Sequence, residues 1–138
     1  MRNNQSIIDN LTGQLLIASP NLNDPNFYKT VTLICENNAM GSLGLIINRP
    51  ATNSIEEIFN ELDLNSVNHF TNVPIMQGGP MGSERGFVIH KDGHYKHTSK
   101  INKQFNITTS RDILEEMSSG NGPKDSLLVL GYAGWGAG

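Results

Sequence analysis

The sequence predicts a single domain of mixed α/β or α+β class, and its length and two kinds of pattern indicate this. The 138 residues correspond to 15.1 kDa, a common size for one domain with one hydrophobic core. Six short apolar runs predict strands, whereas only two stretches show helical periodicity. Strand, helix and strand follow one another only within residues 105–130, so a doubly wound parallel sheet is the less favoured alternative.

The predicted strands are rich in Ile, Leu and Val and are bounded by Gly, Asn and Pro. They are Gln14–Ser19, Thr30–Cys35, Leu43–Asn48, Gly86–His90, Phe105–Thr108 and Ser126–Leu130. The connection Glu36–Ser42 is short and contains Asn and Gly, which predicts an antiparallel hairpin between the second and third strands. Asp92 and Gly93 predict a two-residue hairpin that pairs His90 with Tyr95.

Residues 54–62 form the clearest predicted helix. Ser54 and Glu57 have the S-x-x-E spacing of a capping box, in which each side chain binds the backbone N–H of the other residue. Apolar residues recur at positions i, i+3, i+4 and i+7 from Ile55, so one face of this helix is predicted to pack in the core. The Glu residues on the other face are interpreted as a solvated surface.

The second predicted helix covers Thr109–Ser119. Thr109 and Asp112 have the T-x-x-D spacing that predicts Thr109 as the N-cap. Gly120 is predicted to end the helix, because glycine readily adopts the left-handed backbone conformation found just after helices, and Pro123 follows.

Composition excludes several classes of protein. Ten basic and thirteen acidic residues give a net charge of −3, which is no global signature of binding to nucleic acid or acidic membranes. No apolar run approaches the roughly 20 residues of a membrane-spanning helix. The single cysteine cannot form an intrachain disulfide, and the first ten residues lack the apolar core of a secretory signal. We therefore expect a soluble protein of the reducing cytoplasm with no membrane partner.

Four long sequence blocks resemble one known family. In chain order they are Leu11–Pro20, Gly41–Pro50, Gln77–His90 and Leu127–Gly138. Together they are similar to the AlgH/YqgE-like family of uncharacterised bacterial proteins, some of which are labelled transcriptional regulators. The resemblance implies a bifurcated mixed β-sheet curled into a pseudo-barrel with a few flanking helices. It implies no particular reaction.

The end of the sequence differs from the family pattern. Family members continue past the Gly-rich stretch into a further segment with helical character, whereas this sequence stops at Gly138. We therefore expect residues 1–138 to form a single AlgH/YqgE-like domain that is truncated at its C-terminal end. A partner surface supplied by that segment would then be missing.

The Gly-rich end is one candidate ligand site. Gly131, Gly134 and Gly136 follow a predicted buried strand, which is where loops that bind phosphate occur. They could therefore bind a small anion or a nucleotide. Their spacing matches neither G-x-G-x-x-G nor a P-loop, so tight turns with close backbone packing are the favoured interpretation.

Two arginines are further candidates for a site that binds an anion. Arg49 and Arg85 lie beside predicted buried strands, where a guanidinium can bind a carboxylate or phosphate through two parallel hydrogen bonds. The favoured alternative is a structural role, in which the arginine forms an internal ion pair with Glu84 or Asp112.

Residues 90–103 form a basic segment that contains three histidines. Its basic residues are Lys91, Lys96, Lys100 and Lys103. On the predicted hairpin these lysines form a ribbon that could bind nucleic acid weakly, or an acidic partner. Strand alternation would place His94 on the face opposite His90 and His97, so we expect no metal site.

No catalytic residue is predicted. Cys35 ends an apolar strand without a basic neighbour, which indicates an inert buried thiol. Residues 82–86 have the wrong glycine spacing for the nucleophile turn of a hydrolase. We therefore favour a non-enzymatic binding or interaction protein without a cofactor, with an unknown protein or a small anionic ligand as partner. A nucleic-acid-binding regulator and an anion- or nucleotide-binding protein are the alternatives.

Overall fold

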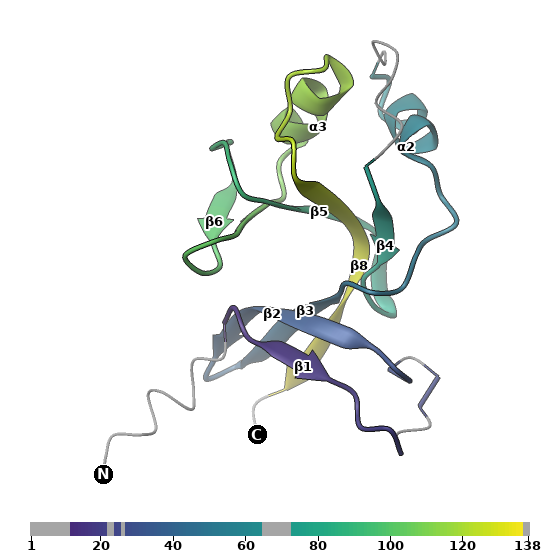
Figure 1. Cartoon of the computed structure of the whole chain (residues 1–138), viewed down its shortest axis with the longest axis vertical. Coiled ribbons are helices and arrows are strands. Elements are labelled where there is room, and N and C mark those ends of the chain that lie inside the picture. Colours follow the sequence, from purple (N-terminus) through teal and green to yellow (C-terminus); the bar gives the residue numbers. More distant parts are fainter. Residues whose placement is uncertain (1–11, 22–23, 26, 65–72, 137–138) are drawn as a thin grey trace.

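The computed structural model describes residues 12–21, 24–25, 27–64 and 73–136, and within these ranges the chain forms eight strands and two helices. The strands are β1 (Leu15–Ile17), β2 (Val31–Asn38), β3 (Gly41–Ile46), β4 (Ile75–Gln77), β5 (Met81–His90), β6 (Thr98–Lys100), β7 (Asn106–Thr108) and β8 (Ser126–Gly136). The helices are α2 (Ile55–Glu61) and α3 (Arg111–Ser118). The strands make one sheet in the order β1-β2-β3-β8-β5-β7-β6, and β4 is an additional neighbour of β8 (Figure 1).

Strand β8 belongs to both arms of the sheet and runs from the helices to the layer of β1, β2 and β3 (Figure 1). Residues 126–130 pair antiparallel with β5, and residues 128–130 also pair parallel with β4. Residues 133–136 pair antiparallel with β3. The sheet therefore forks along β8 and curls into a half-barrel, which confirms the bifurcated mixed sheet that the family resemblance implies.

The fork depends on a close backbone contact at Gly78, just after β4. The Gly78 N–H donates to the Leu130 carbonyl at 2.7 Å, and the Gly78 carbonyl accepts from the Ile46 N–H at 2.8 Å. A Cβ atom at Gly78 would lie 2.3 Å from the Gly131 carbonyl oxygen. Only glycine therefore fits at the position where β3, β4 and β8 meet.

Side chains of the sheet alternate between two hydrophobic clusters, one on each face. On β5, Val88 belongs to the cluster beneath the helices, whereas Phe87 and Ile89 belong to the cluster on the opposite face. Phe59 of α2 and Ile113 of α3 are almost fully buried in the first of these clusters. Both helices therefore cover the same face of the sheet.

Helix α2 begins as predicted. The Ser54 hydroxyl accepts from the Glu57 N–H at 3.2 Å, and the Glu57 carboxylate accepts from the Ser54 N–H at 2.9 Å, which confirms the capping box. Ile55, Ile58 and Phe59 are buried, so the predicted apolar face is the core face.

Helix α3 begins one residue later than predicted. Its N-cap is Ser110, not Thr109, because the Thr109 N–H donates to the His97 carbonyl at 3.1 Å and so belongs to the sheet. The Ser110 hydroxyl donates to the Asp112 carboxylate at 2.5 Å and does not cap the helix backbone. Gly120 ends the helix as predicted, with φ of +89°.

The predicted hairpin at Asp92 and Gly93 is wrong. Residues 88–90 of β5 pair with β7, so the chain after β5 does not fold back along β5. Gly93 does turn the chain, with φ of +93°, but the chain leads to β6, which pairs with the other side of β7. His90 and Tyr95 are therefore not strand partners, and their rings pack edge to face with centroids 5.6 Å apart.

The other predicted strands correspond to observed strands with different ends. The β2–β3 hairpin is confirmed, with its turn at Ala39 and Met40. The three-residue strands β4 and β6 are too short to show a hydrophobic pattern, so the sequence does not predict them. Across the described ranges, no helix is long and apolar enough to span a membrane.

Candidate functional site

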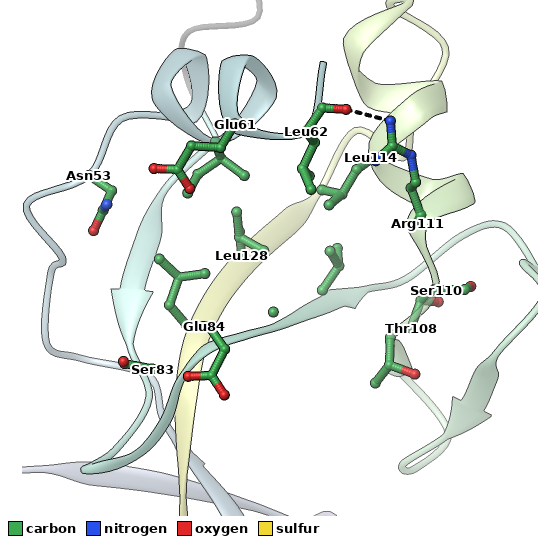
Figure 2. A pocket seen from close by; sticks show the side chains of 15 residues that line it. Asn53, Glu61, Leu62, Ser83, Glu84, Thr108, Ser110, Arg111, Leu114 and Leu128 are labelled. Atoms are coloured by element: carbon green, nitrogen blue, oxygen red, sulfur yellow. Dashed lines mark hydrogen bonds between the residues drawn. The ribbon is translucent and has the colours of Figure 1, made fainter. Parts of the chain in front are cut away.

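A cavity of about 500 Å³ lies between α2 and α3, on the helix-covered face of the sheet (Figure 2). We call it the α2–α3 cleft. Its floor is apolar and combines the two helices with strands β5 and β8. The apolar floor residues are Ile58, Leu62, Val88, Leu114, Leu128 and Leu130.

The floor follows from strand alternation and from one missing side chain. Gly86 and Val88 of β5 lie on the helix side of the sheet, as do Leu128 and Leu130 of β8. A Cβ atom at Gly86 would lie 3.7 Å from the nearest atom of Leu128, which is ordinary contact distance. Glycine is therefore not required there by close packing, and its lack of a side chain leaves the floor open.

One end of the cleft is lined by acidic and polar side chains. Glu61 comes from the end of α2 and Asn53 from the segment before it, while Ser83 and Glu84 come from β5 (Figure 2). Between Met81 and Gly86, four residues of β5 stand opposite one residue of β8, Gly131. This bulge brings Ser83 and Glu84 to the rim of the cleft.

The other end is lined by Arg111, and here the polar groups are bonded within the protein. The Arg111 guanidinium donates to the Leu62 carbonyl, which ties α3 to the end of α2 (Figure 2). It also pairs with Glu115 at 3.3 Å, the one ion pair among the described residues. Sequence reasoning missed Arg111, because an arginine in the first turn of a helix gives no signal of a contact 49 residues away.

Arg49 and Arg85 line neither the cleft nor the second cavity described below. Arg49 donates to the carbonyls of Pro25 and Tyr28, at 2.9 and 3.2 Å, so it holds the loop before β2. Arg85 is exposed, and its guanidinium lies 5.4 and 5.3 Å from the ring centroids of Phe87 and Tyr132.

The ion pair proposed for the arginines, with Glu84 or Asp112, is absent from the described residues. Alternation explains this for Arg85. Its side chain lies on the same face of β5 as that of Phe87, whereas Glu84 lines the cleft on the other face. Asp112 instead accepts from the Ser110 hydroxyl and the Lys96 N–H. Binding of an anion by Arg49 or Arg85 stays a prediction.

Gly131, Gly134 and Gly136 lie within β8 and do not form a loop after it. The strand continues because β3 pairs with its last residues. Gly131 has φ of +81°, and a Cβ atom there would lie 3.0 Å from the carbonyl oxygens of Gly79 and Met81. Close backbone packing thus accounts for Gly131, and anion binding at these glycines stays a prediction.

The four predicted lysines surround β6, the last strand in the sheet order. Lys100 is in β6, Lys91 and Lys96 are in the segment before it, and Lys103 is in the turn after it; all four are exposed. The Lys91 ammonium lies 5.9 Å from the centroid of the Phe105 ring. Binding of nucleic acid to this basic surface stays a prediction.

His90 is fully buried at the base of this segment, and sequence reasoning missed its role. Its Nδ1 lies 2.7 Å from the Asp92 carbonyl, and its Nε2 lies 2.6 Å from the Thr108 hydroxyl. The Thr98 hydroxyl continues the chain of hydrogen bonds, 2.8 Å from Thr108. Because a carbonyl only accepts, Nδ1 carries the proton and Nε2 accepts from Thr108. Burial lowers the pKa of His90.

The remaining candidates are not brought together. His94 and His97 are exposed, and no three His, Cys, Asp or Glu side chains within the described ranges are close enough to hold a metal ion. Burial, with a smaller effect of the Glu36 charge, raises the pKa of the Cys35 thiol to about 12, which makes it a poor nucleophile.

A second cavity, of about 630 Å³, lies on the opposite face of the sheet. Leu33, Ile89 and Phe105 contribute to its mainly apolar lining. Its polar residues, which include Asp125, are fewer than those of the α2–α3 cleft. The cleft therefore offers more groups that can orient a ligand.

Comparison with known proteins identifies the family. The sequence matches the AlgH-like family over residues 15–138. The chain belongs to the AlgH-like family. Two UPF0301 proteins are close relatives: that of Thioalkalivibrio sulfidiphilus is 45% identical over 130 residues, 94% of this chain and 70% of the relative. That of Burkholderia vietnamiensis is 45% identical over 133 residues, 94% of this chain and 69% of the relative.

Two solved structures agree with the fold. The solution structure of the AlgH protein from Pseudomonas aeruginosa matches with a TM-score of 0.77 and 40% identity, over 93% of this chain and 69% of that one. A crystal structure from Corynebacterium diphtheriae, 16% identical, matches with a TM-score of 0.72 over 91% of this chain and 66% of that one, and shows the fold alone.

Proposed function

We propose that this chain is a non-enzymatic binding protein of the cytoplasm, and that it holds its ligand in the α2–α3 cleft. The observation that carries this proposal is the composition of the cleft, an apolar floor with polar side chains gathered at the rim. Its volume of about 500 Å³ lies within the range of small-ligand sites. The apolar floor supplies affinity, and the rim supplies orientation.

The lining residues favour binding over catalysis. None of the described residues that line the cleft is His, Cys, Lys or Tyr. The hydroxyl of Ser110, which lines the cleft, donates to the carboxylate of Asp112, which lies outside the lining. The hydrogen bond from Ser110, with further bonds from backbone N–H groups, lowers the pKa of Asp112. A carboxylate with a lowered pKa is a weak base and activates a hydroxyl poorly.

The cytoplasmic location rests on cysteine content. Cys35 is the only cysteine of the chain. Small secreted domains are commonly held together by disulfides, which a lone cysteine cannot form within one chain. A single thiol of high pKa is compatible with a reducing compartment.

The test is a titration of the ¹⁵N-labelled chain with n-hexanol, an uncharged probe that fits the apolar floor. We expect amide shifts to concentrate at Ile58, Val88, Leu114 and Leu128, with saturation. A Gly86→Val variant puts a side chain into the floor. It should weaken binding of n-hexanol at least ~10-fold, because the valine occupies space that the probe would otherwise fill. Shifts confined to the second cavity, or none at all, would contradict the proposal.

The matched control is Gly134→Val. Gly134 is a strand glycine like Gly86, but it pairs with β3 and lies outside the cleft. A Cβ atom at Gly134 would make only ordinary contacts, the nearest with the sulfur of Met81 at 3.6 Å. It adds the same side chain to a strand and should leave the affinity for n-hexanol unchanged. Equal weakening by both variants would indicate a general effect of valine on the sheet, and the assignment to the cleft would fail.

A further inference from the structure

Strand β1 stands at one end of the sheet order, and among the described residues only β2 pairs with it (Figure 1). Its three residues, Leu15, Leu16 and Ile17, are all apolar and all exposed. Successive side chains of a strand point to opposite faces, so apolar surface is exposed on both faces of this edge. An exposed apolar edge of this kind is a template for pairing with another strand.

The hydrogen bonds of β1 show which of its backbone groups face outward. The Gln14 carbonyl and the Ala18 N–H bond to the backbone of β2 and of the residue before it, at 2.9 and 3.0 Å. The direction of these groups alternates along a strand, so Leu16 also directs its N–H and carbonyl toward β2. Leu15 and Ile17 therefore direct theirs away from β2, toward the other edge of the strand.

The sequence around this edge carries no charge. Residues 10–23 contain no Asp, Glu, Lys or Arg. An ion pair at β1 therefore cannot select the partner, and two copies of the strand do not repel each other. The strand at the other end of the sheet order differs, because β6 contains Lys100 and the other three predicted lysines lie around it. Lysines on an edge disfavour pairing with another chain, so the sheet favours extension at β1.

A second copy of β1 matches this edge when the two strands run antiparallel about a twofold axis at Leu16. Leu15 of each copy then stands opposite Ile17 of the other, and these are the residues whose backbone groups face outward. Each such pair exchanges both of its N–H to carbonyl hydrogen bonds. The two Leu16 side chains meet on one face, and Leu15 packs against Ile17 on the other. The edge is therefore complementary to itself.

We propose that β1 is a dimerisation edge, at which two copies of this chain join their sheets by antiparallel pairing of their β1 strands. A contact that uses the same surface of both copies closes as a dimer and does not grow into a fibre. Three residues from each copy bury less than the ~1,200 Å² of a stable interface, so the dimer is weak and reversible. No residue of β1 lines the α2–α3 cleft, so this inference is independent of the proposed function.

Sedimentation velocity of the native chain tests the proposal between about 10 μM and about 1 mM, a range suited to a weak interface. We expect monomer at the lower concentration and dimer at the higher one. In a mixture of ¹³C-labelled and unlabelled chains, isotope-filtered NOE spectra should then show contacts between the Leu16 side chains of the two copies. A chain that stays monomeric at ~1 mM, or a dimer with no such contacts at β1, would overturn the proposal.

Ile17→Lys places a charge on the edge and should raise the dissociation constant of the dimer at least ~10-fold. The matched control is Met40→Lys, because Met40 lies in the turn between β2 and β3 and is 87% exposed. It adds the same charge, removes an apolar side chain that is more exposed, and should leave the dissociation constant unchanged. Equal weakening by both variants would indicate a nonspecific association, and the assignment to β1 would be wrong.

A backbone variant separates strand pairing from apolar contact. Ile17→Pro removes an N–H that points away from β2, so pairing between β1 and β2 loses no hydrogen bond. It should weaken the dimer at least ~10-fold, because both Leu15–Ile17 pairs lose a bond, whereas Ile17→Val should dimerise like the native chain. Native affinity in Ile17→Pro would contradict the pairing. If urea denaturation shows that Ile17→Pro does not fold, the comparison of the two lysine variants decides alone.

Discussion

His90 is a completely buried imidazole whose two ring nitrogens are both bonded within the chain, to the Asp92 carbonyl and the Thr108 hydroxyl. Both bonds suit the neutral ring, because protonation would place a second donor on Nε2, opposite a hydroxyl that already donates there. Thr108 lies at the edge of the α2–α3 cleft. The protonation state of one ring thus bears on how β5, β6 and β7 are held together.

The pKa of His90 is lowered by burial, so acid should destabilise the fold. In the unfolded chain this group binds a proton as the pH falls below about 6.5, while in the folded chain it stays neutral to lower pH. The contribution of neutral His90 to the free energy of unfolding is therefore present above about pH 6.5, and it is lost as the pH falls through the pKa of His90 in the folded chain. We expect the free energy of unfolding, measured with urea, to drop between pH 7.5 and 5.0, and to drop less in His90→Gln.

The control for this pH dependence is His94→Gln. His94 is exposed, and within the described part of the chain it forms neither a hydrogen bond nor a ring pair with His90. This variant should keep the native pH dependence. A His90→Gln variant whose stability falls as steeply with acid as that of the native chain would show that other groups cause the effect.

Arg85 illustrates how exposure limits the energetic value of a charge. It packs over Phe87 and Tyr132 without an ionic partner in the described chain, and an exposed cation–π contact contributes roughly 0.5–1 kcal/mol. We expect Arg85→Ala to lower the free energy of unfolding by about 1 kcal/mol in urea, and Arg85→Lys to lower it by less. A loss of ~3 kcal/mol or more would instead indicate a buried charge pair.

At the scale of elements, β8 decides the fold because it pairs with β3, β4 and β5. Its first residues lie between β4 and β5, and its last residues pair with β3. The chain must therefore bend between these two parts of β8. Gly131 is at this bend, with φ of +81°, opposite the bulge of β5. The bulge of β5, which shapes the acidic end of the cleft, therefore depends on the bend of β8 at Gly131.

Gly131→Ala should destabilise the protein by about 2 kcal/mol, because a left-handed conformation costs roughly 1–2 kcal/mol outside glycine and the new Cβ is 3.0 Å from two carbonyl oxygens. Gly134→Ala is the comparison, because the φ of Gly134 is not positive and a Cβ atom there would make only ordinary contacts. It should change stability by less than ~1 kcal/mol. Urea denaturation checks both. Equal effects would mean that the bend does not depend on the left-handed conformation.

At the scale of the whole molecule, the two ends of the sheet differ in character. Strand β1 exposes Leu15, Leu16 and Ile17, with 53%, 43% and 76% of their surfaces accessible. Strand β6, at the other end, carries Lys100 and is surrounded by the other predicted lysines. Charged residues on an edge strand disfavour pairing with another chain. The basic surface therefore has a structural explanation beside the predicted binding of nucleic acid.

A salt titration decides between these explanations. If the four lysines contact phosphates, binding to duplex DNA should be weak and independent of sequence, with a slope of log affinity against log salt of roughly −3.6. Lys100→Gln and Lys103→Gln should each reduce the slope by about 0.9. Lys29→Gln, which changes a lysine before β2, should leave the slope unchanged. Fluorescence anisotropy measures all of these, and sequence-selective binding at physiological salt would favour a regulator.

The parts of this protein that the sequence determined are those coded by neighbouring residues. The capping box of Ser54 and Glu57, the stop at Gly120 and the apolar runs of β2 and β3 each depend on a few adjacent positions, and all are confirmed. The ends of elements fail where a distant strand takes part. Thr109 does not cap α3 because His97 holds its N–H, and the turn at Gly93 makes no hairpin because β7 occupies the edge of β5.

The cleft was decided by the tertiary structure. Sequence reasoning selected Arg49, Arg85 and three glycines by residue type, and none of them lines the cleft. Alternation along β5 sends Arg85 to one face and Glu84 to the other, and the phase of that alternation depends on a bulge whose size is set by pairing with β8. The two walls meet where Arg111 binds the carbonyl of Leu62, 49 residues earlier. Such a contact carries no local pattern, because only the packing of both helices on one sheet brings those residues together.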